Sequence, residues 1–149
     1  MTIDNLKFFI ENGKFNIDEN KEFAAEISIY INSKQAKKSS INMPGNFDEL
    51  FLSRQELSKL LTHYLNGKLH EWDLEYICSF IELHYCDDDE KINEVLFNFS
   101  DPYLGYEINK ENVEMALLFL SDKNCELKLM DIKKQKLRES YKSAYCKIE

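Results

Sequence analysis

The chain of 149 residues has enough apolar residues, 44%, for one hydrophobic core, but it is too short for two ordinary domains. Its mean hydropathy of -0.48, and the absence of any apolar run near the roughly 20 residues of a membrane-spanning helix, exclude an integral membrane protein. The net charge of -8 argues against DNA or RNA as a direct ligand, because phosphate binding needs a basic surface. We therefore expect one domain over residues 1–149, with neither a membrane nor a nucleic acid as partner.

The first residues do not resemble a secretory signal. Asp4 and Glu11 lie where such a signal is basic or apolar, and the apolar stretch before Gly13 is brief. Four cysteines in a chain with an adequate core and no export signal are expected to remain reduced thiols. The sequence thus predicts a cytoplasmic protein.

Residues 18–36 carry a pattern that two structures could explain. Phe23, Ile27 and Tyr30 recur at helical spacing, whereas the stretch at 26–31 also alternates as a strand would. Helix is the favoured interpretation. Residues 37–48, which contain a Pro-Gly pair, are expected to form a loop.

Residues 53–67 carry the start and stop signals of a helix. Ser53 precedes Glu56 by three positions, the capping-box arrangement in which each side chain satisfies the other residue's backbone N–H. Leucines then recur at helical spacing, and Gly67 stands where a left-handed C-terminal cap needs a glycine.

A second helix is predicted within residues 70–86. Its apolar side is formed by Leu74, Ile77, Cys78 and Ile81, whereas Trp72, Tyr76 and Ser79 share another side. Because only a few residues separate this helix from Gly67, the two helices are expected to be antiparallel neighbours.

Two further helices follow. Asp87, Asp88 and Asp89 open a helical pattern that continues through Phe99, since acidic side chains are favoured at a helix N-terminus. Asn109 is the expected N-cap of the next helix, whose apolar residues lie between 113 and 120.

The C-terminal segment differs from the rest of the chain in charge. Residues 1–122 hold 11 Lys and Arg against 23 Asp and Glu, whereas residues 123–149 hold 8 against 4. Residues 125–130 alternate like a short strand, and residues 137–144 fit a last amphipathic helix. Overall we predict a mainly α, single-domain antiparallel helical bundle with its best-defined core at 52–120, a short strand near 125–130, and a basic segment at 123–149.

The sequence offers little support for catalysis or for a bound metal or cofactor. Cys78, His84 and Cys86 lack the spacing of a zinc site, and the acidic run after residue 86 lacks the glycine of a calcium loop. Glu126 and Lys128 resemble part of a metal-dependent nuclease site, but so acidic a nuclease would repel its substrate. We expect no enzyme and no cofactor, and keep the nuclease as an alternative.

Acidic and aromatic residues are instead gathered in one part of the sequence. Such a surface suits a basic protein partner, with aromatic side chains as anchors. The alternative is that these carboxylates are solvated helix faces and caps, and that the acidic body attracts the basic segment. The predicted partner-binding residues are Glu71, Trp72, Asp73, Glu75, Tyr76, Glu82, Asp87, Asp88, Asp89, Glu90 and Glu94.

The stretch from Leu52 to Leu120 resembles the bacterial immunity proteins of contact-dependent growth inhibition and related polymorphic toxin systems. It is also similar in kind to small helical colicin immunity proteins. The resemblance rests on LSRQELSKLLTHYLNGKLHEWDLE and on EVLFNFSDPYLGYEINKENVEMALLFL. It implies a mainly helical protein that binds and neutralises a cognate toxin, often a basic nuclease. An adaptor or structural binding protein is the alternative within the class of non-enzymes.

Overall fold

The computed structural model describes residues 1–35, 49–100 and 106–121, and these form six helices without a strand. The helices are α1 (Ile3–Asn12), α2 (Ile17–Gln35), α3 (Arg54–Leu65), α4 (Glu71–His84), α5 (Glu90–Ser100) and α6 (Lys110–Ser121). The predicted mainly helical fold is therefore confirmed. The predicted loop at 37–48, the strand near 125–130 and the helix at 137–144 lie outside the described residues.

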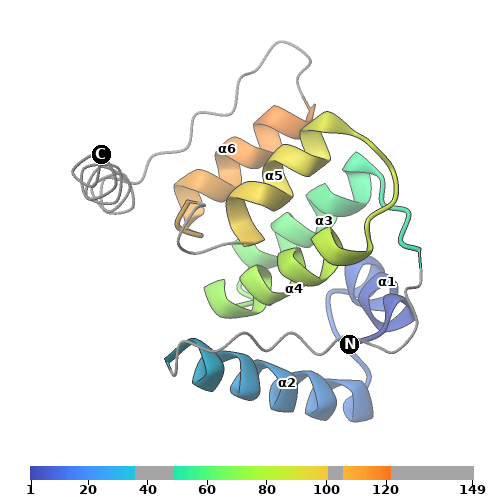
Figure 1. Ribbon diagram of the computed structural model, residues 1–149, viewed down its shortest axis with the longest axis vertical. Coiled ribbons are helices and arrows are strands. Elements are labelled where there is room, and N and C mark those ends of the chain that lie inside the picture. Colours follow the sequence, from blue (N-terminus) through green and yellow to red (C-terminus); the bar gives the residue numbers. More distant parts are fainter. Residues whose placement is uncertain (36–48, 101–105, 122–149) are drawn as a thin grey trace, which may run out of the picture.

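Helix α4 lies at the centre of the bundle (Figure 1), where it contacts α2, α3 and α5. Helices α3 and α4 run in opposite directions in this view, as their short connection predicts, and α5 returns antiparallel to α4. Nine residues of α4 are buried, including Tyr76 and Ser79, which share a side of the helix with Trp72. Tyr76 packs against α2, and the Ser79 hydroxyl donates to the Ser100 carbonyl of α5.

Local capping signals fix the starts of three helices as predicted. Ser53 and Glu56 form the capping box of α3, with the Ser53 hydroxyl accepting from the Glu56 amide at 3.1 Å. Asn109 Oδ1 accepts from the Asn112 amide at 2.8 Å and so caps α6. Asp89 caps α5, accepting from the Lys91 and Ile92 amides at 3.0 and 3.3 Å.

Helix α1 was not predicted. The hydroxyl of Thr2 accepts from the Asn5 amide at 3.1 Å, and Gly13 ends the helix in the left-handed conformation. Leu6, Phe9 and Ile10 of this helix are buried against α3. The short apolar stretch is thus one face of a helix of about three turns, which is stabilised by its packing against α3.

None of the helices in the described part of the chain is long and apolar enough to cross a membrane.

Candidate acidic interaction surface

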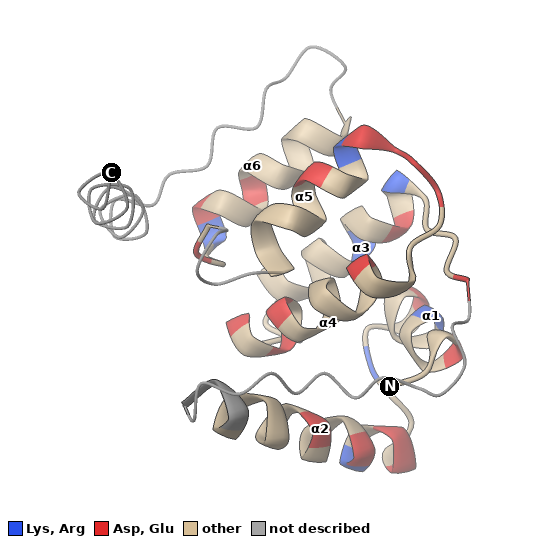
Figure 2. Ribbon diagram, viewed as in Figure 1, with Lys and Arg blue, Asp and Glu red and all other residues tan. Residues whose placement is uncertain are grey.

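Figure 2 shows acidic residues along α4, the connection to α5, α5 and α6, in addition to those on α1 and α2. Between residues 71 and 121, the described part of the chain has 12 Asp and Glu against two lysines. Nine of the carboxylates are exposed, at positions 71, 82, 87, 88, 90, 94, 107, 111 and 114. Both lysines are engaged. Lys91 donates to the Phe119 carbonyl at 2.6 Å, and Lys110 lies 4.0 Å from Glu114.

Two predicted site residues are not on this surface. Tyr76 is 1% exposed and its hydroxyl donates to Glu26 Oε2 at 2.8 Å, whereas Glu75 is 6% exposed and accepts from the Tyr30 hydroxyl at 3.3 Å. The structure therefore contradicts an exposed position for Glu75 and Tyr76. Both hold α2 against α4, because the side of α4 that carries them is covered by α2.

Two further predicted site residues, Asp73 and Asp89, form hydrogen bonds at helix N-termini. Asp73 is half-buried and accepts from the His70 amide at 2.8 Å, at the N-terminus of α4. Asp89 caps α5 and also accepts from Arg54 at 2.7 Å. Burial alone would raise the pKa of Asp89, but the hydrogen bonds from Arg54 and the α5 amides hold the pKa of that carboxyl below its ordinary value. These carboxylates contribute charge without being free to reorganise around a partner.

The remaining predicted residues are exposed. Asp88 accepts from the Asn93 side chain at 3.2 Å, and Glu82 accepts from the Ser100 hydroxyl. Trp72, the only tryptophan of the chain, is 41% exposed. The full exposed group is Glu71, Trp72, Glu82, Asp87, Asp88, Glu90 and Glu94, which we call the acidic face together with Glu107, Glu111 and Glu114 of the α6 region.

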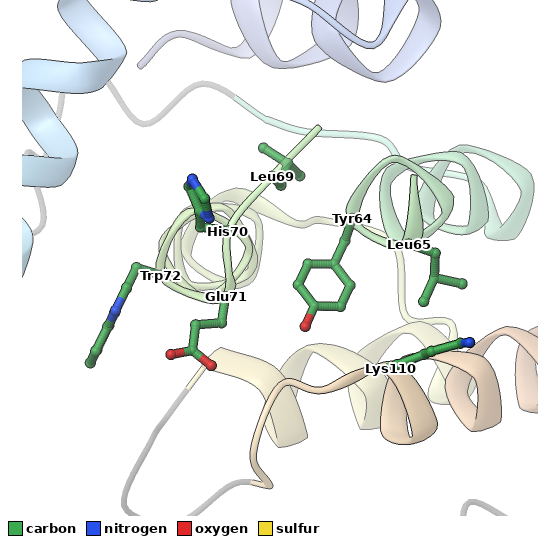
Figure 3. Close-up of a pocket in the computed structure, with 7 residues that line it drawn as sticks. All are labelled: Tyr64, Leu65, Leu69, His70, Glu71, Trp72 and Lys110. Carbon is green, nitrogen blue, oxygen red and sulfur yellow. The ribbon is translucent and has the colours of Figure 1, made fainter. Parts of the chain in front are cut away.

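A pocket of about 510 Å³ opens at one end of the acidic face, where α3, α4 and α6 meet. It is lined by Tyr64 and Leu65 of α3, by residues 69–72 at the start of α4, and by Lys110 of α6. In Figure 3 the Tyr64 hydroxyl and the Glu71 carboxylate point into the same space, and the Trp72 ring lies on the outer side of Glu71. Its volume falls in the range that suits a small ligand or a single large side chain.

Carboxylates act on the Tyr64 hydroxyl in the pocket. Partial burial raises the pKa of the Tyr64 phenol, and three neighbouring carboxylates shift it further in the same direction, those of Glu71, Glu107 and Glu111. The proximity of these residues to Tyr64 was not predicted from the sequence. The spacing of Glu111 and Glu114, three positions apart, shows only that these two carboxylates share one side of α6.

Among the residues that the structure describes, no three His, Cys, Asp or Glu side chains are grouped so that they could hold a metal ion. Cys78 is buried and Cys86 is exposed. The alternative nuclease residues, Glu126 and Lys128, lie outside the described residues.

No family model, curated protein or solved structure matches the chain.

Proposed function

We propose that this protein is an immunity protein, which binds a basic toxin domain and neutralises it. The partner of such a protein would be cationic, as nuclease domains often are, and the complex would form without catalysis by this chain. The resemblance of residues 52–120 to small helical immunity proteins supports the proposal.

The charge balance of the acidic face is the observation that carries this function. Nine exposed carboxylates share the described part of residues 71–121 with two lysines, and both lysines already have partners. Like charges gathered in this way repel one another and lower the stability of the fold, so a cationic partner would relieve a cost that the free protein bears. A helix face that only contacts solvent would not require so many more carboxylates than lysines.

The proposed mechanism has two stages. Long-range attraction first guides the cationic partner to the acidic face, which can raise the association rate from about 10⁶ to about 10⁸ M⁻¹s⁻¹ or more at low salt. Apolar and aromatic contacts, with the exposed ring of Trp72 as an anchor, then slow dissociation.

The first test is recovery of the partner. The tagged protein is purified from its native strain at low salt, and the co-purifying protein is identified by mass. We expect a basic polypeptide whose toxic activity is lost in the complex. A neutral or acidic housekeeping partner would contradict the proposal and favour the adaptor alternative.

The second test measures the association rate with that partner. The triple variant Asp87→Asn, Asp88→Asn and Glu90→Gln removes three of the nine carboxylates of the acidic face but keeps Asp89, because Asp89 caps α5. A matched control removes the same charge from exposed positions of α1 and α2, with Asp4→Asn, Asp18→Asn and Glu22→Gln. We expect the first variant to associate about tenfold more slowly at low salt and the control to change less than about twofold. Equal slowing by both variants would mean that only net charge matters.

A further inference from the structure

The pocket at the meeting point of α3, α4 and α6 combines three features that one kind of side chain would satisfy together. Tyr64 and Trp72 supply aromatic rings, Leu65 and Leu69 supply apolar wall, and Glu71 supplies a carboxylate at the opening. A planar cation on an aliphatic stem matches all three, because its stem packs on apolar surface while its head reaches the carboxylate.

The net charge around the pocket favours a cation. Glu71 and Lys110 are the charged residues that line the pocket. Glu107 and Glu111 are close enough to raise the pKa of the Tyr64 phenol, and Glu114 lies 4.0 Å from Lys110 Nζ, so these five groups together carry three negative units. The N-termini of α4 and α6 also lie here, and each acts as about +0.5 elementary charge. The two helix ends together offset only about one of the three negative units.

We propose that this pocket binds the side chain of one arginine of the basic partner, an inference that rests on the proposed function and names the group recognised. The guanidinium would pair with the Glu71 carboxylate through two parallel N–H donors and lie against the ring of Tyr64, with Trp72 on the outer side of Glu71. A lysine fits less well, because its compact ammonium is strongly hydrated and cannot stack or donate in this forked way.

Lys110 allows a test in which removal of a side-chain charge should strengthen binding. Its side chain lines the pocket and is only weakly held, since Nζ lies 4.0 Å from Glu114 and the side chain is 76% exposed. A cation entering the pocket is repelled by it. Removing this charge should therefore strengthen binding, whereas removing the Glu71 charge should weaken it.

The experiment uses the full chain and N-acetylarginine amide as the probe, at constant ionic strength. The indole N–H of Trp72 gives a single cross-peak in an NMR spectrum of the labelled protein, because the chain has one tryptophan. We expect a saturable shift of this peak with the arginine probe, weaker binding of the lysine analogue, and no binding of the uncharged citrulline analogue.

Three variants then locate the site. We expect Glu71→Gln to weaken binding of the arginine probe about tenfold and Lys110→Gln to strengthen it about threefold. Glu22→Gln, an exposed change on α2 outside both the pocket and the acidic face, should leave binding unchanged. The proposal is overturned if citrulline binds as well as arginine, if Glu71→Gln and Glu22→Gln behave alike, or if Lys110→Gln fails to strengthen binding.

Failure of this inference can be told apart from failure of the proposed function. If the recovered basic partner binds the Glu71→Gln variant as tightly as the natural protein but is lost from the triple variant, the pocket inference fails and the function stands. If the pocket binds the arginine probe and no basic partner is recovered, the function fails and the cation site stands.

Discussion

The hydroxyl of Tyr76 donates a hydrogen bond of 2.8 Å to Glu26 Oε2, which joins α4 to α2 across 50 residues of sequence. The same carboxylate pairs with the amino group of Met1, and the Tyr76 ring packs edge-on against Tyr30 with 5.2 Å between centroids. A tyrosine on an acidic helix, expected to contact a partner, therefore contacts another part of its own fold.

Replacing Tyr76 by Phe should lower the free energy of unfolding by about 1.5 kcal/mol, because a hydrogen bond to a charged carboxylate is lost while the ring packing is kept. Urea unfolding followed by circular dichroism would measure the change. Association with a basic partner should not change, since Tyr76 is 1% exposed. A loss of stability below about 0.5 kcal/mol would count against a role for this bond.

Two glycines with the same backbone conformation offer a matched pair of variants. Gly13 has φ of 69° and Gly67 has φ of 77°, so alanine is strained at both positions. A Cβ at Gly13 would also lie 3.0 Å from His63 Cε1, whereas a Cβ at Gly67 would meet nothing within 4 Å. We expect Gly67→Ala to cost about 1 kcal/mol.

Gly13→Ala should cost about 2 kcal/mol or more, because the His63 ring cannot move away freely. His63 Nε2 lies 2.8 Å from the Ile10 carbonyl oxygen, and its ring packs edge-on against Phe9. Thermal unfolding of the two variants gives the comparison. Equal losses would show that the ring adjusts without cost.

The ion pair of Asp89 with Arg54 should make stability depend on pH. Because the folded pKa of Asp89 lies below the ordinary value of 3.8, this carboxylate stabilises the fold fully well above that value, and the contribution is lost as the pH falls through the lowered pKa. Asp89→Asn keeps the cap of α5 but removes the charge pair. We expect it to cost roughly 0.5 to 1 kcal/mol at pH 7, since the pair is partly exposed, and less at pH 2, where more of the carboxylate is protonated.

Urea unfolding at both pH values measures this difference, with Asp87→Asn as the control on an exposed neighbour. The control should differ little from the natural protein at either pH. A cost of Asp89→Asn that stays the same at pH 2 would assign the effect to the cap and not to the charge.

The two described cysteines should differ sharply in reactivity. Burial raises the pKa of the Cys78 thiol far above its ordinary value, with Glu75 and Glu82 adding to the shift, whereas Cys86 is exposed. Brief alkylation of the folded protein, followed by peptide mass analysis, should label Cys86 and leave Cys78 unmodified until urea unfolds the chain. Labelling of Cys78 at the rate of Cys86 under native conditions would contradict its burial.

Much of the helical structure was predictable from local signals. A cap joins residues two or three positions apart, so the pairs at Ser53 and Glu56, and at Asn109 and Asn112, carry their information in the sequence itself. The excess of acidic residues between 71 and 114 is likewise visible without a structure, because charge is a property of composition.

Other features depended on contacts between distant residues. The sequence alone did not show that α1 forms, because its apolar face is short and is stabilised by α3. Nor did it show that Glu75 and Tyr76 are buried, because a helical pattern does not state how many of its sides other helices will cover.

The pocket lined by Tyr64, Glu71 and Trp72 could not be predicted from local sequence signals. The sequence alone determined the helices that carry these residues and the acidic character of the region. Only the tertiary structure decided that the C-terminus of α3 and the N-termini of α4 and α6 would meet, and so which carboxylates act on one cavity. The physical reason is that capping and periodicity act within a few residues, whereas an electrostatic site is formed by side chains that packing brings together.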